Sequence, residues 1–212
     1  MKTATILAGI EYLRGRDAIL AAVIDRTGEF RLKRKRNIFV ALVSAIVSQQ
    51  ISTGAARSIY RRLCERAGGE KGLLDCLLKS TPEELRSVGL SPQKQRYLRD
   101  LAEKVANGEV HLDALNKLSN EEIIAELTKI KGIGLWTVQM LLIFSLGRLD
   151  VFPGGDLGVR TAIRRLYRKR SLPTKPAQLR KYEKLWQPYG SIASWYCWRS
   201  LELKTESDVV QS

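Results

Sequence analysis

The residue best placed to do chemistry is Asp156, which follows a run of chain-breaking residues. Residues 151–156 read VFPGGD and lead into a predicted helix over residues 157–169. An aspartate at such a point is commonly an N-cap, whose side chain accepts hydrogen bonds from the first turn of the helix. The positive end of the helix dipole also favours a negative charge there. Asp156 is therefore a structural cap, a catalytic carboxylate facing a cleft, or both.

A second candidate is the glycine pair Gly132 and Gly134, between predicted helices over residues 121–129 and 136–146. Two glycines one residue apart permit positive φ angles and let backbone N–H groups approach a ligand closely. The helix that follows presents unpaired N–H groups at its positive end, which suits an anion such as phosphate. Backbone donors would hold that phosphate without reading base sequence. Taken alone, however, a G-x-G turn between helices is more often purely structural.

Composition restricts the other chemistry that the chain can perform. A single histidine, His111, argues against a Ser-His-Asp triad and against a multi-histidine metal site. The three cysteines, Cys64, Cys76 and Cys197, are too few for a four-cysteine iron–sulfur cluster. Their wide spacing also fits neither a disulfide framework nor a C-x-x-C zinc site. Carboxylate, aromatic and backbone chemistry remain.

The charge balance indicates a polyanionic partner. The 36 Lys and Arg outnumber the 22 Asp and Glu, for a formal net charge of +14, which favours nucleic acid or an anionic membrane surface. No apolar run approaches the roughly 18 residues of a spanning helix, and the N-terminus lacks a signal-peptide pattern. We expect no membrane partner, and a cytoplasmic, nucleoid-associated protein in a bacterium or archaeon or a nuclear one in a eukaryote. The basic run at residues 31–36 suits a phosphate contact or a localisation signal, although solvated surface is the commoner interpretation.

Helix signals dominate the rest of the chain. Apolar residues recur at helical spacing over residues 38–64, and Thr81-Pro82-Glu83-Glu84 is a capping box with proline at the first helical position. Ser91-Pro92 and Ser119 mark two further helix starts. No stretch shows sustained period-two alternation bounded by hairpin turns. We therefore expect an all-α protein.

Together, the hairpin and the aspartate resemble the signature of the helix-hairpin-helix DNA glycosylase superfamily. Residues 131–137, KGIGLWT, are similar to that superfamily's hairpin, and residues 151–160, VFPGGDLGVR, are similar to the catalytic loop of 3-methyladenine DNA glycosylase II. Asp156 lies twenty positions after Trp136, which matches the family's spacing between its hairpin tryptophan and its catalytic aspartate. The resemblance extends from Phe39 to Arg199 and implies that Asp156 is catalytic.

The resemblance implies DNA contacts at two places. One is the hairpin, where the contacting residues would be Lys131, Gly132, Gly134 and Thr137. The other is the family's first signature helix, similar to residues 46–52, where the contacting residues would be Gln49, Gln50 and Ser52. Gln50 takes the wedge position that fills the gap left by an extruded base, where the family's best-known bacterial member has leucine. The family's hairpin carbonyls often hold a monovalent cation, Na⁺ or K⁺, and the matching residues here are Thr128, Ile130 and Ile133; no other cofactor is implied.

The resemblance also implies a pocket for the flipped base. Its residues would be Trp136, Met140, Leu157 and Tyr189. Stacking a cationic base on an aromatic ring is worth roughly 0.5–2 kcal/mol. Trp195 is a further candidate, although core packing is the ordinary explanation for it and for Trp198. Three positions depart from the family, since Met140 replaces a frequent aromatic, Tyr189 a tryptophan and Gly190 a frequent arginine.

The implied fold has two helical lobes with the active cleft between them. We expect a central lobe over residues 37–146 that includes the hairpin, and a second lobe, made of residues 1–36 and 147–212, that carries Asp156. The larger bacterial relatives have an additional N-terminal β-containing domain. Only one helical segment precedes residue 31 here, so the sequence looks like the compact form.

The implied activity is hydrolysis of the N-glycosidic bond of alkylated purines, of the 3-methyladenine and 7-methylguanine type, in damaged double-stranded DNA. The base would be flipped out first, and Asp156 would stabilise the oxocarbenium-like charge on the sugar. Relatives that also cut the strand carry a Schiff-base lysine where this chain has Trp136, so we expect a monofunctional, monomeric enzyme. The alternatives are a glycosylase for a neutral base such as hypoxanthine and a non-catalytic helix-hairpin-helix module that binds DNA.

Overall fold

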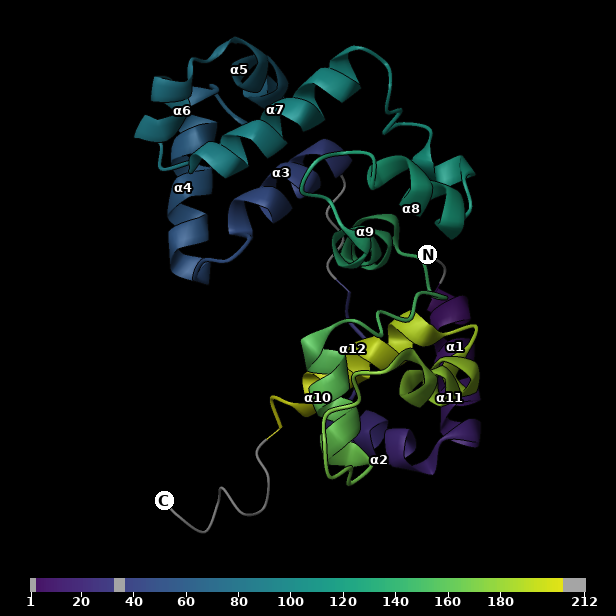
Figure 1. Cartoon of the computed structure of the whole chain (residues 1–212). Coiled ribbons are helices and arrows are strands. Elements are labelled where there is room, and N and C mark those ends of the chain that lie inside the picture. The colour runs from purple at the N-terminus through teal and green to yellow at the C-terminus, as the bar shows by residue number, and fades with distance from the viewer. Residues whose placement is uncertain (1–2, 33–36, 204–212) are drawn as a thin grey trace, which may run out of the picture. The chain divides into compact units, whose positions relative to one another are not determined.

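The computed structural model describes residues 3–32 and 37–203 (Figure 1). The chain divides into two compact units, unit 1 made of Met1–Arg34 with Leu142–Ser212, and unit 2 made of Lys35–Leu141. Every regular element in the described ranges is a helix, so the predicted all-α fold is confirmed. Unit 2 ends at Leu141, five residues before the expected end of the central lobe at residue 146. Of the basic run at 31–36, residues 33–36 lie outside the described residues.

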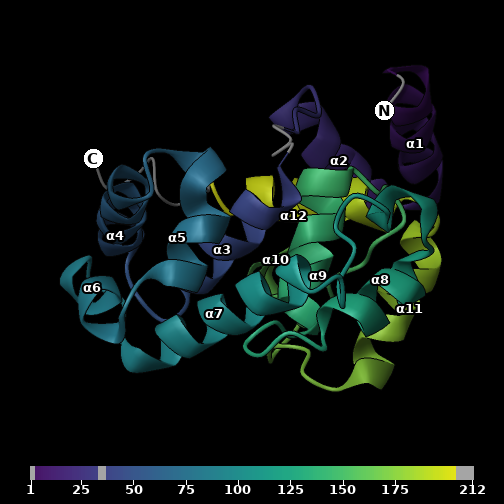
Figure 2. The same ribbon diagram turned by 90° about the horizontal axis from the view of Figure 1, so that it is seen from above.

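Unit 2 is organised around one long helix, α7. Its elements are α3 (Ile38–Ser48), α4 (Thr53–Arg66), η1 (Glu70–Gly72), α5 (Leu73–Lys79), α6 (Pro82–Ser87), α7 (Pro92–Ala106), η2 (Leu115–Lys117), α8 (Asn120–Leu127) and α9 (Leu135–Leu141). Helix α7 packs against α3, α5 and α6, and α9 packs against α3 and α8 (Figure 2). The predicted capping box at Thr81–Glu84 is present, and Ser119 caps α8 in the same way with Glu122.

The helical pattern over residues 38–64 is interrupted in the structure, where α3 and α4 are separate helices. Helix α3 ends at Ser48, because Gln49 has a ψ of 131° and Gln50 a φ of +57°, both outside the right-handed helical region. Ser52 then restarts the helix, because its Oγ accepts a hydrogen bond from the Ala55 N–H at 3.3 Å. Apolar spacing alone did not show the break, which creates an exposed loop over residues 49–52.

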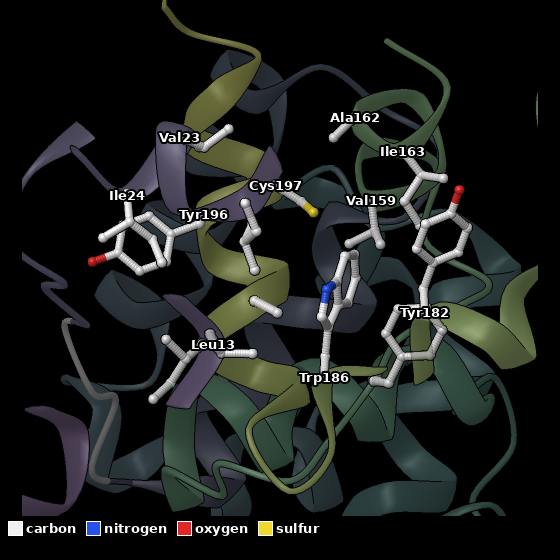
Figure 3. Packing of buried hydrophobic residues seen from close by; sticks show 14 of the residues in the cluster. Leu13, Val23, Ile24, Val159, Ala162, Ile163, Tyr182, Trp186, Tyr196 and Cys197 are labelled. Carbon is white, nitrogen blue, oxygen red and sulfur yellow. The ribbon is translucent and has the colours of Figure 1, made fainter. Parts of the chain in front are cut away.

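Unit 1 is organised around α12. Its elements are α1 (Thr3–Arg16), α2 (Ala18–Thr27), the π-helix η3 (Leu142–Leu146), α10 (Leu157–Leu166), α11 (Pro176–Trp186) and α12 (Gly190–Ser200). Helix α12 packs against α1, α2, α10 and α11. In Figure 3, its Cys197 lies between side chains of α2 and α10 such as Val23 and Val159, and its Tyr196 lies on the α2 side. This core supports the loop that carries Asp156.

The predicted helix over residues 157–169 ends earlier, at Leu166. Arg168 has a φ of +47°, so the backbone leaves the right-handed helical path there. Among the described helices, none combines the length and the apolar character that crossing a bilayer requires.

Candidate active site

The loop that leads to Asp156 is held by the first turn of α12. Ser191 Oγ accepts a hydrogen bond from the Val151 N–H at 3.1 Å and donates one to the Val151 carbonyl at 3.2 Å. The Ser191 N–H donates to the Leu149 carbonyl at 2.9 Å. A Cβ added at Gly190 would lie 3.0 Å from the Val151 carbonyl oxygen. A larger residue at position 190, such as the arginine frequent in the family, would therefore displace this loop.

Asp156 is the N-cap of α10, as the sequence predicted. Its Oδ1 accepts a hydrogen bond from the Val159 N–H at 2.9 Å. The same oxygen accepts a second one, at 2.8 Å, from the indole Nε1–H of Trp198 on α12. The residue is only 9% exposed. Two donors from different helices therefore fix the orientation of a buried carboxylate, and such bonds are strongest when the carboxylate is ionised.

Trp198 belongs to the site, although the sequence favoured ordinary core packing for it. Its ring stacks on Phe144 of η3, with ring centroids 5.5 Å apart and an interplanar angle of 29°. A Cβ at Gly158 would lie 2.8 Å from Trp198 Cδ1 and 3.1 Å from Asp156 Oδ1. A side chain at position 158 would therefore collide with the Trp198 ring and the Asp156 carboxylate, which is why glycine fits the first turn of α10. Single-turn π-helices such as η3 also occur frequently at functional sites.

Two predicted pocket residues lie in unit 1 and have different surroundings. Leu157, next to Asp156, is 64% exposed and is available for contact with a ligand. The Tyr189 ring packs edge-on against Tyr12 of α1, with centroids 5.3 Å apart. A Cβ added at Gly9 of α1 would lie only 2.7 Å from the Tyr189 ring. The ring of Tyr189 therefore holds α1 against the start of α12.

The other two predicted pocket residues, Trp136 and Met140, lie on α9 in unit 2. The Trp136 side chain is 50% exposed, and Met140 is half-buried. The remaining aromatic candidate, Trp195, packs edge-on against Phe30 and Tyr196, with centroids 5.0 and 4.9 Å away. Core packing, the ordinary explanation for Trp195, is thus what the structure shows.

The hairpin rests on one face of α7. Gly132 has a φ of +80°, and a Cβ there would lie 2.2 Å from the ring of Tyr97. The Lys131 N–H donates to Asp100 Oδ2 at 2.8 Å, and Lys131 Nζ lies 3.4 Å from Oδ1 of the same carboxylate. The two glycines differ, because Gly134 is outside the left-handed region and a Cβ there would meet no described atom within 4 Å. Of the two glycines, only Gly132 uses the positive φ that glycine permits.

The loop over residues 49–52 is attached to the same hairpin. Gln49 Nε2 donates to the Gly132 carbonyl at 2.8 Å, so this predicted DNA contact positions the hairpin. Lys94 Nζ donates to the Val47 carbonyl at 2.7 Å, and burial lowers the pKa of Lys94. Lys94, Tyr97 and Asp100 are spaced three residues apart and so share one face of α7. Sequence reasoning missed Asp100 and the positioning role of this face.

The remaining hairpin predictions fall on residues with ordinary backbone roles. Helix α9 begins after Gly134, whose carbonyl accepts the Val138 N–H at 3.1 Å. The Thr137 side chain is buried. The group that Thr137 could offer to an anion is therefore its backbone N–H, which lies in the first turn of α9. Among the predicted cation ligands, Thr128 is the C-cap of α8, and the Ile130 carbonyl accepts the Ile133 N–H at 3.1 Å. The cation itself stays a prediction.

The chain resembles known proteins over most of its length. Residues 43–188 match the family described as HhH-GPD superfamily base excision DNA repair protein. The chain belongs to this superfamily. It is 36% identical over 204 residues to DNA-3-methyladenine glycosylase 1 of Schizosaccharomyces pombe. The aligned region covers 91% of this chain and 86% of that protein.

Solved structures agree with this assignment. The S. pombe 3-methyladenine DNA glycosylase in complex with abasic DNA superposes with a TM-score of 0.81 at 33% identity, over 94% of this chain and 100% of that one. The DNA-3-methyladenine glycosidase of Bacillus halodurans gives a TM-score of 0.83 at 33% identity, over 96% of each chain. The family and the fold predicted from the sequence are confirmed.

Proposed function

We propose that this DNA glycosylase of base excision repair releases alkylated purines from double-stranded DNA, with Asp156 as its catalytic carboxylate. The glycosylase class agrees with the family and with relatives named DNA-3-methyladenine glycosylase. The observation that carries the assignment of Asp156 is its geometry, a buried carboxylate oriented by Val159 and Trp198 beside the exposed Leu157.

The chemistry requires charge stabilisation more than proton donation. When the bond between C1′ and the base breaks, its electron pair leaves with the base and positive charge develops on the sugar. A fixed carboxylate stabilises that charge without reorganising, and a water molecule then adds to C1′ and loses a proton. An alkylated purine is already cationic and leaves as a neutral base. Asp156 is therefore sufficient without a second acid.

The hairpin would bind the DNA backbone, and this binding would offset the free energy that base flipping requires. Flipping a base out of the duplex costs a few kcal/mol. The open space at Gly134 and the first-turn N–H groups of α9 suit a backbone phosphate. A monovalent cation on the carbonyls of Thr128, Ile130 and Ile133 would add positive charge at the same place. We propose that the enzyme acts as a monomer on DNA in the nucleoid or nucleus, with Gln50 as the inserted wedge.

The positions of two amines support the proposed absence of strand cutting. Trp136 stands where strand-cutting relatives carry their lysine. Lys131, on the hairpin, has its Nζ beside the Asp100 carboxylate at 3.4 Å. Lys94 is buried, and its Nζ donates to the Val47 carbonyl. These two lysines are engaged in holding the hairpin and α3, so the proposed reaction ends with an abasic site.

Mass spectrometry of bases released from broadly methylated DNA tests this proposal, with Asp156→Asn as the matched variant. Wild type should release 3-methyladenine and 7-methylguanine, and Asp156→Asn should release neither while still binding DNA. Release of hypoxanthine alone, from a duplex with that single lesion, would instead assign the enzyme to neutral bases. Tight binding without any release would assign a binding module, and a borohydride-trapped adduct would contradict the monofunctional proposal.

A further inference from the structure

A pocket of about 370 Å³ lies in unit 1, between the end of α10 and the start of α11. Three of its lining side chains are cations, Lys169, Arg170 and Lys181, and none of its described lining residues is acidic. All three cations are exposed. Neither the hairpin nor Asp156 contributes to this pocket, so its positive charge is unexplained by the proposed catalytic site.

Tyr182 lines the pocket from the protein core. It is 2% exposed, and its buried hydroxyl has no hydrogen-bond partner among the described residues. Figure 3 shows the Tyr182 ring beside Ile163, another lining residue, with its hydroxyl pointing away from Trp186. Leaving such a group unpaired is unfavourable, and a buried polar group in this state points to a missing partner.

The surroundings of the Tyr182 hydroxyl suit an anionic partner. Burial, with a smaller contribution from the Asp17 and Cys197 charges, raises the pKa of Tyr182, and the charge of Lys169 lowers it, so the phenol remains a neutral donor. Lys181 Nζ lies 4.7 Å from the centroid of the Tyr182 ring, a cation–π contact that holds a second ammonium group over this ring. A neutral hydroxyl that feels the charge of Lys169, with the Lys181 ammonium over its ring, suits donation to an oxyanion.

Gln178 supplies a further oriented donor at the start of α11. Its Oε1 accepts hydrogen bonds from the Thr174 and Lys175 N–H groups, both at 3.0 Å. The oxygen end of the amide is therefore occupied by backbone, and the NH₂ end is left as a donor for the pocket that Gln178 lines. The pocket thus combines cations with neutral donors, the usual composition of a phosphate site.

We propose that this pocket binds a phosphate group, with Lys169, Arg170 and Lys181 neutralising its charge and Tyr182 donating to one of its oxygens. The volume is within the range of small-molecule sites, so the phosphate belongs either to the DNA backbone or to a small phosphorylated molecule. This site is separate from base release, and its function does not depend on Asp156.

Titration of the full-length protein with inorganic phosphate, followed by its thermal midpoint at constant ionic strength, tests the site. A ligand that binds only the folded state raises the midpoint in a saturable way. Replacing Lys169→Ala together with Lys181→Ala should weaken the apparent affinity about tenfold or more, because each charge-assisted bond contributes on the order of 1.5 kcal/mol. The matched control is Arg180→Ala with Lys184→Ala, two exposed cations of α11 outside the lining.

Tyr182→Phe tests the buried hydroxyl without changing the charge. This variant should lose part of the phosphate-dependent rise yet keep or raise the midpoint measured without phosphate, because an unpaired buried group is removed. A drop in that baseline midpoint, with the phosphate response unchanged, would show that the hydroxyl is structural and would remove it from the site.

A DNA-binding measurement distinguishes the two sources of phosphate. If the site receives a backbone phosphate, the Lys169/Lys181 variant should reduce the slope of log affinity against log salt by about 0.9 per lost contact, relative to the control. Equal slopes, together with weakened phosphate binding, would assign a small phosphorylated molecule. If the pocket variant matches the control in both measurements, the proposal is overturned.

Discussion

Two aspartates in unit 1 make nearly the same local structure. Asp17 caps α2 and Asp156 caps α10, both are buried at 5% and 9% exposure, and each accepts a hydrogen bond from a tryptophan indole. The bonds differ in which oxygens they use. Asp17 accepts the Ile19 and Leu20 N–H groups on Oδ1, and the Tyr167 hydroxyl and Trp186 indole on Oδ2. At Asp156 both described bonds end on Oδ1.

The two aspartates differ in what surrounds them. Asp17 uses four donors to connect α2 with α10 and α11 inside the core. Asp156 lies at a loop, with Leu157 exposed beside it. Burial and capping therefore do not identify a catalytic aspartate, and the proposed role of Asp156 rests on its place in the loop and on the family resemblance.

The largest expected effect is on the activity of Asp156→Asn. Loss of the negative charge should lower the rate of base release about 10³-fold, as expected for removing about 4 kcal/mol of transition-state stabilisation. Stability should change by less than about 1 kcal/mol, because asparagine is an equally good N-cap and its carbonyl oxygen can keep both bonds on Oδ1. Single-turnover base release and urea unfolding measure the two effects. A strongly destabilised variant would mean that Asp156 is mainly structural.

The reciprocal change, Asp17→Asn, should act on stability. The amide NH₂ would face the Trp186 indole N–H, which cannot reorient, so two buried donors would oppose each other. The expected loss is about 2–4 kcal/mol in the free energy of unfolding, measured by urea denaturation. Base release per folded molecule should remain near that of wild type, and a selective loss of activity would end the contrast between the two aspartates.

The hairpin glycines extend the contrast to unit 2. Gly132→Ala should lower stability by about 2 kcal/mol or more, because alanine is strained at positive φ and its Cβ would overlap Tyr97. Gly134→Ala should fold normally and bind duplex DNA more weakly, since its Cβ would occupy the proposed path of the phosphate. Thermal unfolding and a DNA-binding isotherm for both variants check this pair. Unchanged DNA affinity in Gly134→Ala would contradict the assigned phosphate contact.

The tryptophan partners offer a finer version of the same test. Trp198→Phe keeps an aromatic ring next to Phe144 but removes the donor to Asp156, so base release should slow about fivefold to tenfold, as expected for a hydrogen bond of about 1 kcal/mol. Trp186→Phe should leave the rate per folded molecule unchanged and lower the midpoint of unfolding, because Trp186 is fully buried. Equal activity losses in both variants would place Trp198 outside the site.

The smallest effect concerns the exposed caps, where no core surrounds the carboxylate. A hydrogen bond from the Ser119 backbone N–H lowers the pKa of Glu122. A lowered carboxyl pKa contributes stability above pH 4.5 that is lost as the pH falls through the folded-state value. Glu122→Gln should therefore unfold at a midpoint close to that of wild type below this range and slightly lower at pH 7. Thermal unfolding from pH 3 to 7 measures the difference.

Much of the fold and part of the site could be predicted from local sequence. The caps at Thr81, Ser119 and Asp156, and the need for glycine at position 132, follow from interactions within a few residues, which a sequence displays directly. Family resemblance added the glycosylase class and the position of Asp156. The break at Gln50 was missed because the apolar spacing continues through it.

The sequence by itself thus determined the helical class, the hairpin and the capped aspartate, since each depends on short-range backbone geometry. Only the tertiary structure decided which residues support them. Trp198 meets Asp156 from 42 positions away, Gln49 meets Gly132 from 83, and Trp186 meets Asp17 from 169. Such pairs form when helices pack, and packing is set by the whole core rather than by the spacing of any one segment. For the same reason, two aspartates with similar local roles became distinguishable only through the residues packed around them.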